Sequence, residues 1–297
     1  MTRAAAYIRT RQSPSGGFCF YRYGGIDEPN LGDTYYSVAA LRLFGIEVPN
    51  ARKTAEFVSQ ARIFGLTYLY FCSFTLDHLG LASRISEEKL AAIRNLSITV
   101  PEAGRSVDTS GWLESVRKTI RLQQRFAPTS LGSAARRDKE NPGSGASDDG
   151  SESRYAQVSG FVADLMKRGG FGVRSNLWDS CVVLSVGSLL GLRPPEEMAA
   201  FIEALQQPPV GFLMTPHSAV TSLDVAYAGA RCCEILALAV RHSQEVIDFT
   251  LSCQTTNGGF AHASMALPNL EFTYRGLQTL ALLVPELMQR PNAESRR

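Results

Sequence analysis

A short phrase of glutamine, glycine and phenylalanine recurs along this 297-residue chain. It reads QSPSGGF at residues 12–18 and QTTNGGF at residues 254–260, and related versions end at Phe171 and Phe212. The last three of these phenylalanines stand 41 and 48 residues apart, a suitable length for two helices and two turns. Because recurrence at such a period is typical of repeat architectures, we expect the chain to stack one helical unit several times.

A second recurring element is an apolar run that begins near an acidic residue or a threonine. Asp33–Gly45 and Asp179–Gly191 share the same spacing from acid to glycine and are apolar almost all round. A helix without a wide polar face is covered on both sides, so these runs predict an inner layer of helices. The remaining runs of this kind start near Thr67, Asp108, Asp224 and Glu271.

More polar, amphipathic runs alternate with the apolar ones and suit an outer layer of helices. They cover residues 2–12, 50–63, 86–96, 153–167, 194–206 and 243–254. Six outer and six inner helices predict an all-α fold, an (α/α)6 barrel that takes in residues 1–297 as one domain. Residues 128–153 are rich in Gly, Ser, Pro and charge, which predicts a flexible insertion between the third and fourth helix pairs.

The composition narrows the range of partners and compartments. The formal net charge is only +2, which argues against nucleic acid as a partner. No apolar run reaches the roughly 18 residues that a transmembrane helix requires. The six cysteines form no CxxC pair, as expected of a reduced compartment. We therefore expect a cytoplasmic protein without a transmembrane segment.

Residues 16–45, GGFCFYRYGGIDEPNLGDTYYSVAALRLFG, resemble the repeat of the protein prenyltransferase β subunits and the terpenoid cyclases. The glutamine phrases resemble the QW motif of the cyclases, with phenylalanine in the place of tryptophan. The resemblance implies an α/α toroid in which the glutamine caps outer helices, the glycines allow the turn, and the phenylalanine packs between repeats. It also implies isoprenoid chemistry and, for a β subunit, a helical-repeat α subunit as partner.

The stretch GGFGVRSNLWDSCVV at residues 169–183 resembles the zinc and diphosphate region of the β subunits. The resemblance places Arg174 at the diphosphate arginine and Asp179 and Cys181 at two zinc ligands. A carboxylate and a thiolate are both suitable ligands for zinc. The stretch departs from the family at Leu177 and Val182, which take the places of a lysine and a tyrosine, and no third zinc ligand is evident. In the alternative interpretation, Asp179 caps a helix and Cys181 is a small buried side chain.

Acidic residues at the starts of the inner helices are candidate catalytic groups. In a toroid they would gather around one end of the central cavity, where a desolvated carboxyl group could serve as acid or base. In the alternative interpretation each of them caps a helix or favours its dipole. The DxDD motif of the class II cyclases is absent from the sequence. The catalytic candidates are Asp33, Asp179, Asp224 and Glu271.

Aromatic residues on or beside the inner helices would suit an isoprenoid chain, because aromatic faces bind both apolar groups and cations. Alternatively, they simply fill the barrel. The candidates for substrate binding are Tyr35, Tyr68, Trp178, Tyr227 and Tyr274. Arg22 and Arg275 join Arg174 as candidates for contact with a diphosphate.

Three functions follow from these patterns. The first is a transferase that uses a prenyl diphosphate, farnesyl or geranylgeranyl, and resembles a protein prenyltransferase β subunit, possible zinc included. The second is a compact terpene cyclase in which an Asp or Glu of the inner cavity is the acid or base. The third is a toroid without catalytic activity that binds a lipid or a protein.

Overall fold

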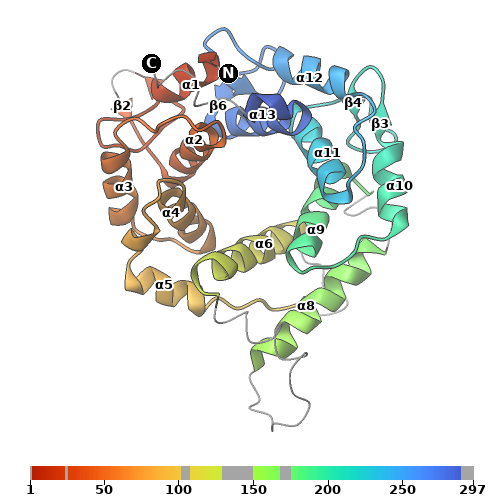
Figure 1. The fold of residues 1–297 in the computed structure, drawn as a ribbon, viewed down its shortest axis with the longest axis horizontal. Coiled ribbons are helices and arrows are strands. Elements are labelled where there is room, and N and C mark those ends of the chain that lie inside the picture. The colour runs from red at the N-terminus through yellow and green to blue at the C-terminus, as the bar shows by residue number, and fades with distance from the viewer. Residues whose placement is uncertain (1, 24–25, 102–107, 129–149, 168–174, 289–297) are drawn as a thin grey trace.

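The computed structural model describes residues 2–23, 26–101, 108–128, 150–167 and 175–288. Twelve α-helices in these ranges form two concentric rings around a central opening (Figure 1). The predicted all-α toroid of six inner and six outer helices is confirmed. The strands are three two-residue pairs, β1 (Arg22–Tyr23) with β2 (Ile26–Asp27), β3 (Gln206–Gln207) with β4 (Gly211–Phe212), and β5 (Phe260–Ala261) with β6 (Pro268–Asn269).

The two rings alternate along the chain, as the sequence predicts. The inner helices are α2 (Leu31–Leu43), α4 (Leu66–His78), α6 (Thr109–Phe126), α9 (Leu177–Leu189), α11 (Leu223–Leu236) and α13 (Leu270–Leu283). The outer helices are α1 (Thr2–Arg9), α3 (Ala51–Gln60), α5 (Glu87–Arg94), α8 (Gly150–Met166), α10 (Glu196–Ala204) and α12 (Ser243–Ser252). Short 3-10 helices, η1 (Ala82–Arg84) and η2 (Pro285–Met288), follow α4 and α13.

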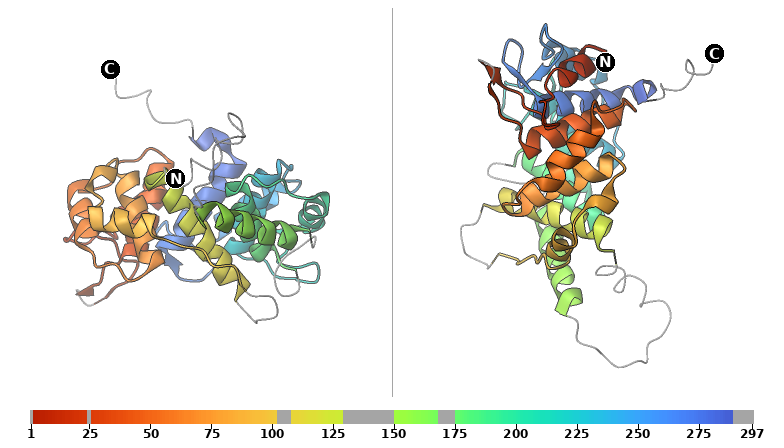
Figure 2. Two further views of the ribbon diagram at one scale, coloured as in Figure 1. Left: turned by 90° about the horizontal axis from the view of Figure 1, so that it is seen from below. Right: turned by 90° about the vertical axis from the view of Figure 1, so that its left-hand side faces the viewer.

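The inner ring is closed. Each inner helix packs against the next one in the chain, and the last, α13, packs against the first, α2. Figure 2 shows the two layers from the side, with α1 next to the last helices. The Arg3 side chain strengthens this closure by donating to the main-chain oxygen of Thr256 at 2.8 Å. The chain therefore forms a complete ring instead of an open superhelix.

The glutamine phrases are tight antiparallel hairpins. Gln12 pairs with Phe18, Gln206 with Phe212, and Gln254 with Phe260. Gly16 and Gly258 have φ of 95° and 97° in two of these turns, and a Cβ atom at Gly258 would lie 2.3 Å from the Arg3 oxygen. Both the backbone conformation and the close approach therefore require glycine. The phrase that ends at Phe171 lies outside the described residues.

The phenylalanine of each described hairpin is at most 1% exposed, and two of them occupy a place that only glycine leaves open. A Cβ atom on Gly229 of α11 would lie 2.3 Å from the Phe212 ring, and one on Gly276 of α13 would lie 2.6 Å from the Phe260 ring. The hairpin thus anchors its ring on the following inner helix. This agrees with the packing role that the family resemblance implies.

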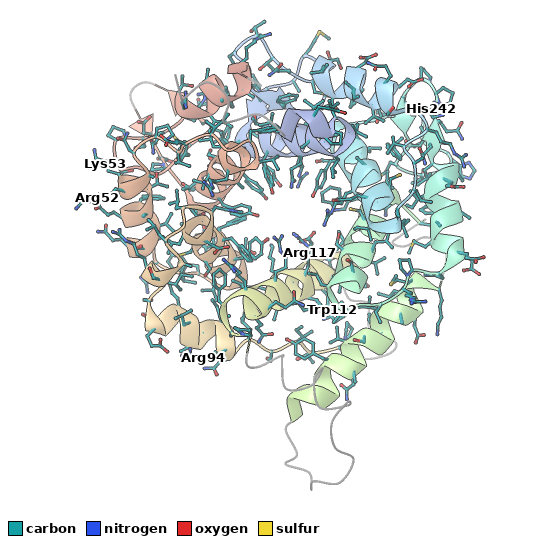
Figure 3. The ribbon with its side chains drawn as sticks, in the orientation of Figure 1. Arg52, Lys53, Arg94, Trp112, Arg117 and His242 are labelled. Atoms are coloured by element: carbon teal, nitrogen blue, oxygen red, sulfur yellow. The ribbon has the colours of Figure 1, made fainter. Side chains whose placement is uncertain are left out.

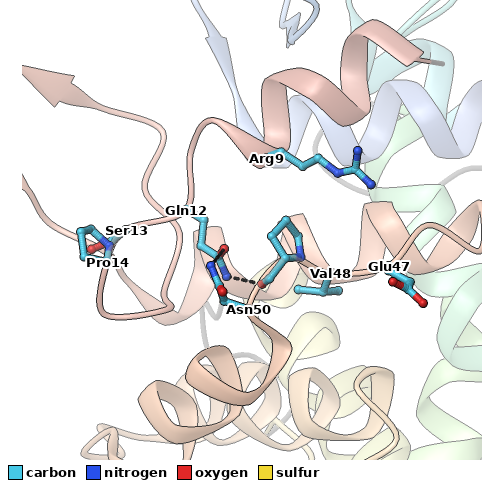
Figure 4. A pocket seen from close by; sticks show the side chains of 8 residues that line it. Arg9, Gln12, Ser13, Pro14, Glu47, Val48 and Asn50 are labelled. Atoms are coloured by element: carbon cyan, nitrogen blue, oxygen red, sulfur yellow. Dashed lines mark hydrogen bonds between the residues drawn. The ribbon is translucent and has the colours of Figure 1, made fainter.

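The glutamine of the phrase connects neighbouring repeats. Gln12 Nε2 donates to the Pro49 oxygen at 2.5 Å and to Thr54 Oγ1 at 2.9 Å, at the start of α3 (Figure 4). An open hollow of ≈ 670 Å³ lies at this junction, lined by Arg9 and Glu47 among others. Gln206 makes the equivalent connection, because its Nε2 donates to the Ala239 oxygen at 3.2 Å.

Most inner helices begin one or two residues before the acidic residue that marks them in the sequence. Asn30, Asn176, Ser222 and Asn269 are the N-caps, and each accepts a hydrogen bond from the main chain three residues later. The alternative interpretation of the acids as caps is therefore wrong for Asp33, Asp179, Asp224 and Glu271, which lie in the first helical turn. An acid there still complements the helix dipole. Asp108 is a true cap, since it accepts from the Gly111 nitrogen.

The predicted insertion at residues 128–153 lies almost entirely outside the described residues. The outer helix that follows it, α8, begins at Gly150, three residues before the expected start at Ser153.

Candidate functional site

The inner ring encloses a cavity of ≈ 640 Å³ to which all six inner helices contribute. A volume of this order is typical of sites for small organic ligands. One part of the wall is aromatic, and it includes four of the five aromatic residues that the sequence singles out. The aromatic side chains that line the cavity are Tyr35, Tyr36, Tyr70, Phe71, Trp178, Tyr227 and Tyr274.

Most of the aromatic wall is a connected cluster around Tyr35, whereas Trp178 and Tyr227 form a pair of their own, with ring centres 6.4 Å apart. The Tyr35 ring lies 5.1 Å from Phe71, 5.6 Å from Tyr70 and 6.3 Å from Tyr274, measured between ring centres. Tyr68, also predicted to bind substrate, does not line the cavity. Its ring is 42% exposed and packs against Phe64 at 5.9 Å, because its position in the first turn of α4 faces outward.

A charged stripe on α6 faces the aromatic wall, and the sequence analysis missed it. Glu114, Arg117, Lys118 and Arg121 all line the cavity, and their spacing of three, four and seven residues places them on one face of the helix. In Figure 3, Arg117 points toward the central opening, whereas Trp112 lies between α6 and α8. The signal was available in the sequence as a charged face on a helix assigned to the inner layer.

Arg275 joins two of the predicted catalytic acids. Its guanidinium group donates to Asp224 and, at 2.5 Å, to Glu271. The same guanidinium lies 4.7 Å from the centre of the Trp178 ring, a cation–π contact. Tyr36 donates to Glu271 at 3.0 Å, which completes the set of contacts on that carboxylate. Asp224, Glu271 and Arg275 thus form a single ion-paired group, of which Glu271 and Arg275 line the cavity.

Like Asp224, the other two predicted acids are not among the residues that line the cavity. Asp33 accepts hydrogen bonds from the Phe20 nitrogen at 3.0 Å and from Asn30 Nδ2 at 2.8 Å. Burial raises the pKa of Asp33, although these hydrogen bonds oppose the shift. Asp179 accepts from Ser110 Oγ and from Asn176 Nδ2, both at 2.6 Å. Both carboxylates therefore join the helix starts to the preceding loops or to the neighbouring helix.

The predicted metal pair does not fit a zinc site in the described part of the chain. The Asp179 carboxylate is occupied by Ser110 and Asn176, while Cys181 lines the cavity. Cys232 donates a hydrogen bond that lowers the pKa of the Cys181 thiol, against the opposing effect of burial. No group of three or more His, Cys, Asp or Glu side chains with a suitable arrangement for a metal occurs among the described residues.

Two of the predicted diphosphate contacts lie beyond what the structure describes. Arg174 lies outside the described residues, and the Arg22 side chain is not described although its main chain belongs to β1. Of the three candidates, Arg275 is the one whose side chain the structure places at the cavity.

A comparison with protein-family models identifies the class to which this ring and cavity belong. The model of the prenyltransferase alpha-alpha toroid domain matches residues 1–67 and 145–296. The chain therefore belongs to the prenyltransferase α/α toroid family. No curated protein matches the chain. Among the described residues, no helix is both long and apolar enough to cross a membrane.

Proposed function

We propose that this protein binds an isoprenoid diphosphate in its central cavity and transfers the prenyl group to an acceptor. The observation that carries the proposal is the composition of the cavity wall, where aromatic rings and basic side chains face the same space. An isoprenoid diphosphate has the same two parts, an apolar unsaturated chain and an anionic head. Membership of the prenyltransferase toroid family supports this ligand class.

The wall suits the charge changes of such a transfer. The bond between C1 of the prenyl group and the diphosphate oxygen breaks, and the diphosphate leaves with the bonding electrons. The nucleophilic atom of the acceptor bonds to C1, and its proton passes to the departing diphosphate or to solvent. Basic side chains stabilise the departing anion, and aromatic rings such as Tyr35 and Tyr274 stabilise positive charge that develops on the allylic carbon.

The acidic residues of the cavity favour a transferase over a cyclase. A terpene cyclase that protonates its substrate needs a protonated carboxyl group that faces the substrate. Glu114 accepts from Arg117, and Glu271 accepts from Arg275 and Tyr36. Both carboxylates are thus engaged as hydrogen-bond acceptors by side chains of the wall, and neither is presented to the cavity as a free acid.

Calorimetric titration with farnesyl diphosphate and geranylgeranyl diphosphate tests the proposal. We expect saturable binding of at least one of them at micromolar concentration. Incubation with a radiolabelled prenyl diphosphate, followed by product analysis, then separates the activities. A prenylated acceptor supports a transferase, and a cyclised hydrocarbon or alcohol replaces it with a cyclase. No binding of either diphosphate would overturn the proposal and favour a toroid that binds another lipid or a protein.

A transferase of the β-subunit kind would also work with a helical-repeat α subunit. Affinity purification of the tagged protein from its own cells, followed by mass spectrometry, tests for that partner. A helical-repeat protein recovered in equal amount supports the β-subunit form of the proposal, whereas recovery of the chain alone, together with activity, shows that no partner is needed.

A further inference from the structure

Five basic side chains of the described residues reach the cavity, and three of them already have a carboxylate partner. Arg117 donates to Glu114 at 2.7 Å, and Arg275 is paired with Asp224 and Glu271. Arg231 is paired with Glu234, one helical turn away. These three arginines bring their own counter-charge, and a ligand would have to compete with it.

Lys118 and Arg121 are different, since neither forms an ion pair with any carboxylate in the described ranges. Lys118 Nζ donates to Thr67 Oγ1 at 3.0 Å, a neutral partner. Burial lowers the pKa of Lys118, and Glu114 offsets this effect only in part. A cation that is partly removed from water without a counter-ion is costly, and an anionic ligand would remove that cost.

The position of Arg121 connects this unpaired charge to the aromatic wall. Its guanidinium lies 5.6 Å from the centre of the Tyr70 ring and 5.0 Å from that of Phe74. Tyr70 in turn contacts Tyr35, so Arg121 lies directly beside the aromatic cluster. Lys118 and Arg121 are three residues apart on one helix face, close enough for two groups of one anion.

The location of the pair within the sequence is also informative. Residues 68–144, which include all of α6, lie between the two segments that the family model matches. The diphosphate arginine implied by the family resemblance is Arg174, in the loop before α9. The unpaired cations on α6 are thus a feature of this chain that the matched family segments do not contain.

We infer that Lys118 and Arg121 form the diphosphate subsite of the cavity, with the prenyl chain lying from there along Tyr70, Tyr35 and Tyr274. This inference rests on the proposed function for the prenyl part of the ligand, but the anion subsite can be tested separately. Arg275, fixed by two carboxylates, then belongs to the wall opposite and leaves the diphosphate to α6.

The test compares three ligands with matched variants of α6. Farnesyl diphosphate, inorganic pyrophosphate and farnesol are titrated into the wild type, Lys118→Met, Arg121→Met and the control Arg125→Met. Arg125 lies on the same helix, but its side chain is 59% exposed and paired with Asp77. We expect Lys118→Met and Arg121→Met each to weaken the binding of farnesyl diphosphate and pyrophosphate by about 10-fold to 100-fold, as befits the loss of a charged hydrogen bond. Farnesol binding and the control should keep the wild-type values.

Each outcome decides the inference. If both variants bind farnesyl diphosphate as tightly as the wild type, the subsite is wrong while the proposed function stands. If the wild type binds pyrophosphate but neither prenyl diphosphate, and both variants lose pyrophosphate, the anion subsite stands and the proposed function fails. If the wild type binds none of the phosphates, both are overturned. Circular dichroism verifies that each variant is folded. Lys118→Arg keeps the positive charge and should bind both phosphates as the wild type does, so it separates the loss of charge from the loss of folding.

Discussion

The guanidinium group of Arg275 lies 4.7 Å from the centre of the Trp178 ring and is held there by carboxylates from two helices. Trp178 belongs to α9, Asp224 to α11, and Glu271 to α13, the helix of Arg275 itself. One side chain thus connects three successive inner helices at the cavity wall. Its contribution to stability should exceed that of an ordinary surface ion pair.

Arg275→Met should lower the free energy of unfolding by about 2 kcal/mol or more, because it leaves two carboxylates close together without their partner. Chemical denaturation of the purified variant measures this change. The triple variant Arg275→Met, Asp224→Asn, Glu271→Gln should recover part of the loss. Arg52→Met is the control, since Arg52 is 86% exposed in its pair with Glu56 and its removal should change little. Equal losses for Arg275→Met and Arg52→Met would contradict this account.

Gly229→Ala should lower the free energy of unfolding by about 1–3 kcal/mol, because the added methyl group overlaps the buried Phe212 ring. Alanine is otherwise the better helix former, so the sign of the effect comes from packing alone. Gly160 in α8 is the matched control, since a Cβ atom there meets nothing within 4 Å. Gly160→Ala should raise the free energy of unfolding by up to about 1 kcal/mol. Thermal or chemical unfolding that shows the same sign for both variants would refute the packing role of Phe212.

His78 should make the stability depend on pH. Burial lowers the pKa of His78 below its ordinary value of 6.5, an effect that Asp77 opposes and that Arg121 and Arg42 reinforce. The unfolded chain therefore binds this proton more readily than the fold, so stability present above pH 6.5 is lost as the pH falls toward the folded-state pKa.

Unfolding measured at about pH 7.5 and about pH 5.5 checks this expectation, because histidine titrates in that interval. His78→Gln should lose less stability between the two conditions than the wild type. His217→Gln, a substitution at an exposed loop position, should retain the wild-type loss. Indistinguishable losses for His78→Gln and the wild type would assign the pH dependence to other groups.

Zinc content tests the metal interpretation of Asp179 and Cys181. Because the Asp179 carboxylate is bound by Ser110 and Asn176, we expect protein purified without chelators to contain far less than one zinc per chain. Atomic emission spectroscopy provides the measurement. A stoichiometric content that Cys181→Ser abolishes would reinstate the zinc site.

Much of the fold can be predicted from the sequence because the same hairpin and the same pair of helices recur along the chain. The pairing of Gln12 with Phe18 recurs as Gln254 with Phe260, and the alternation of apolar and amphipathic runs separates the two layers. The number of helix pairs predicts a closed ring, but the contacts that close it cannot be read from the sequence. Those contacts are between α13 and α2, which are far apart in the chain.

The site could be predicted only in part. Tyr35 and Tyr274 could be predicted to line the cavity, because the apolar runs that contain them indicate inner helices. The Lys118 and Arg121 pair was missed because a charged helix face ordinarily points to solvent. The predicted acids Asp224 and Glu271 were placed near the cavity, but their shared partner Arg275 lies on a different helix from Asp224, and that pairing is a matter of tertiary structure.

The contact between the first and last repeats means that the ring has no intrinsic start. Arg3 holds the N-terminal helix to the turn at Thr256, so the first repeat packs on the last one much as neighbouring repeats pack on each other. A circularly permuted chain, with its ends joined by a linker and opened outside the glutamine hairpins, for example between α3 and α4, should fold into the same toroid. The cavity is formed by all six inner helices together, so it does not depend on which repeat comes first in the chain.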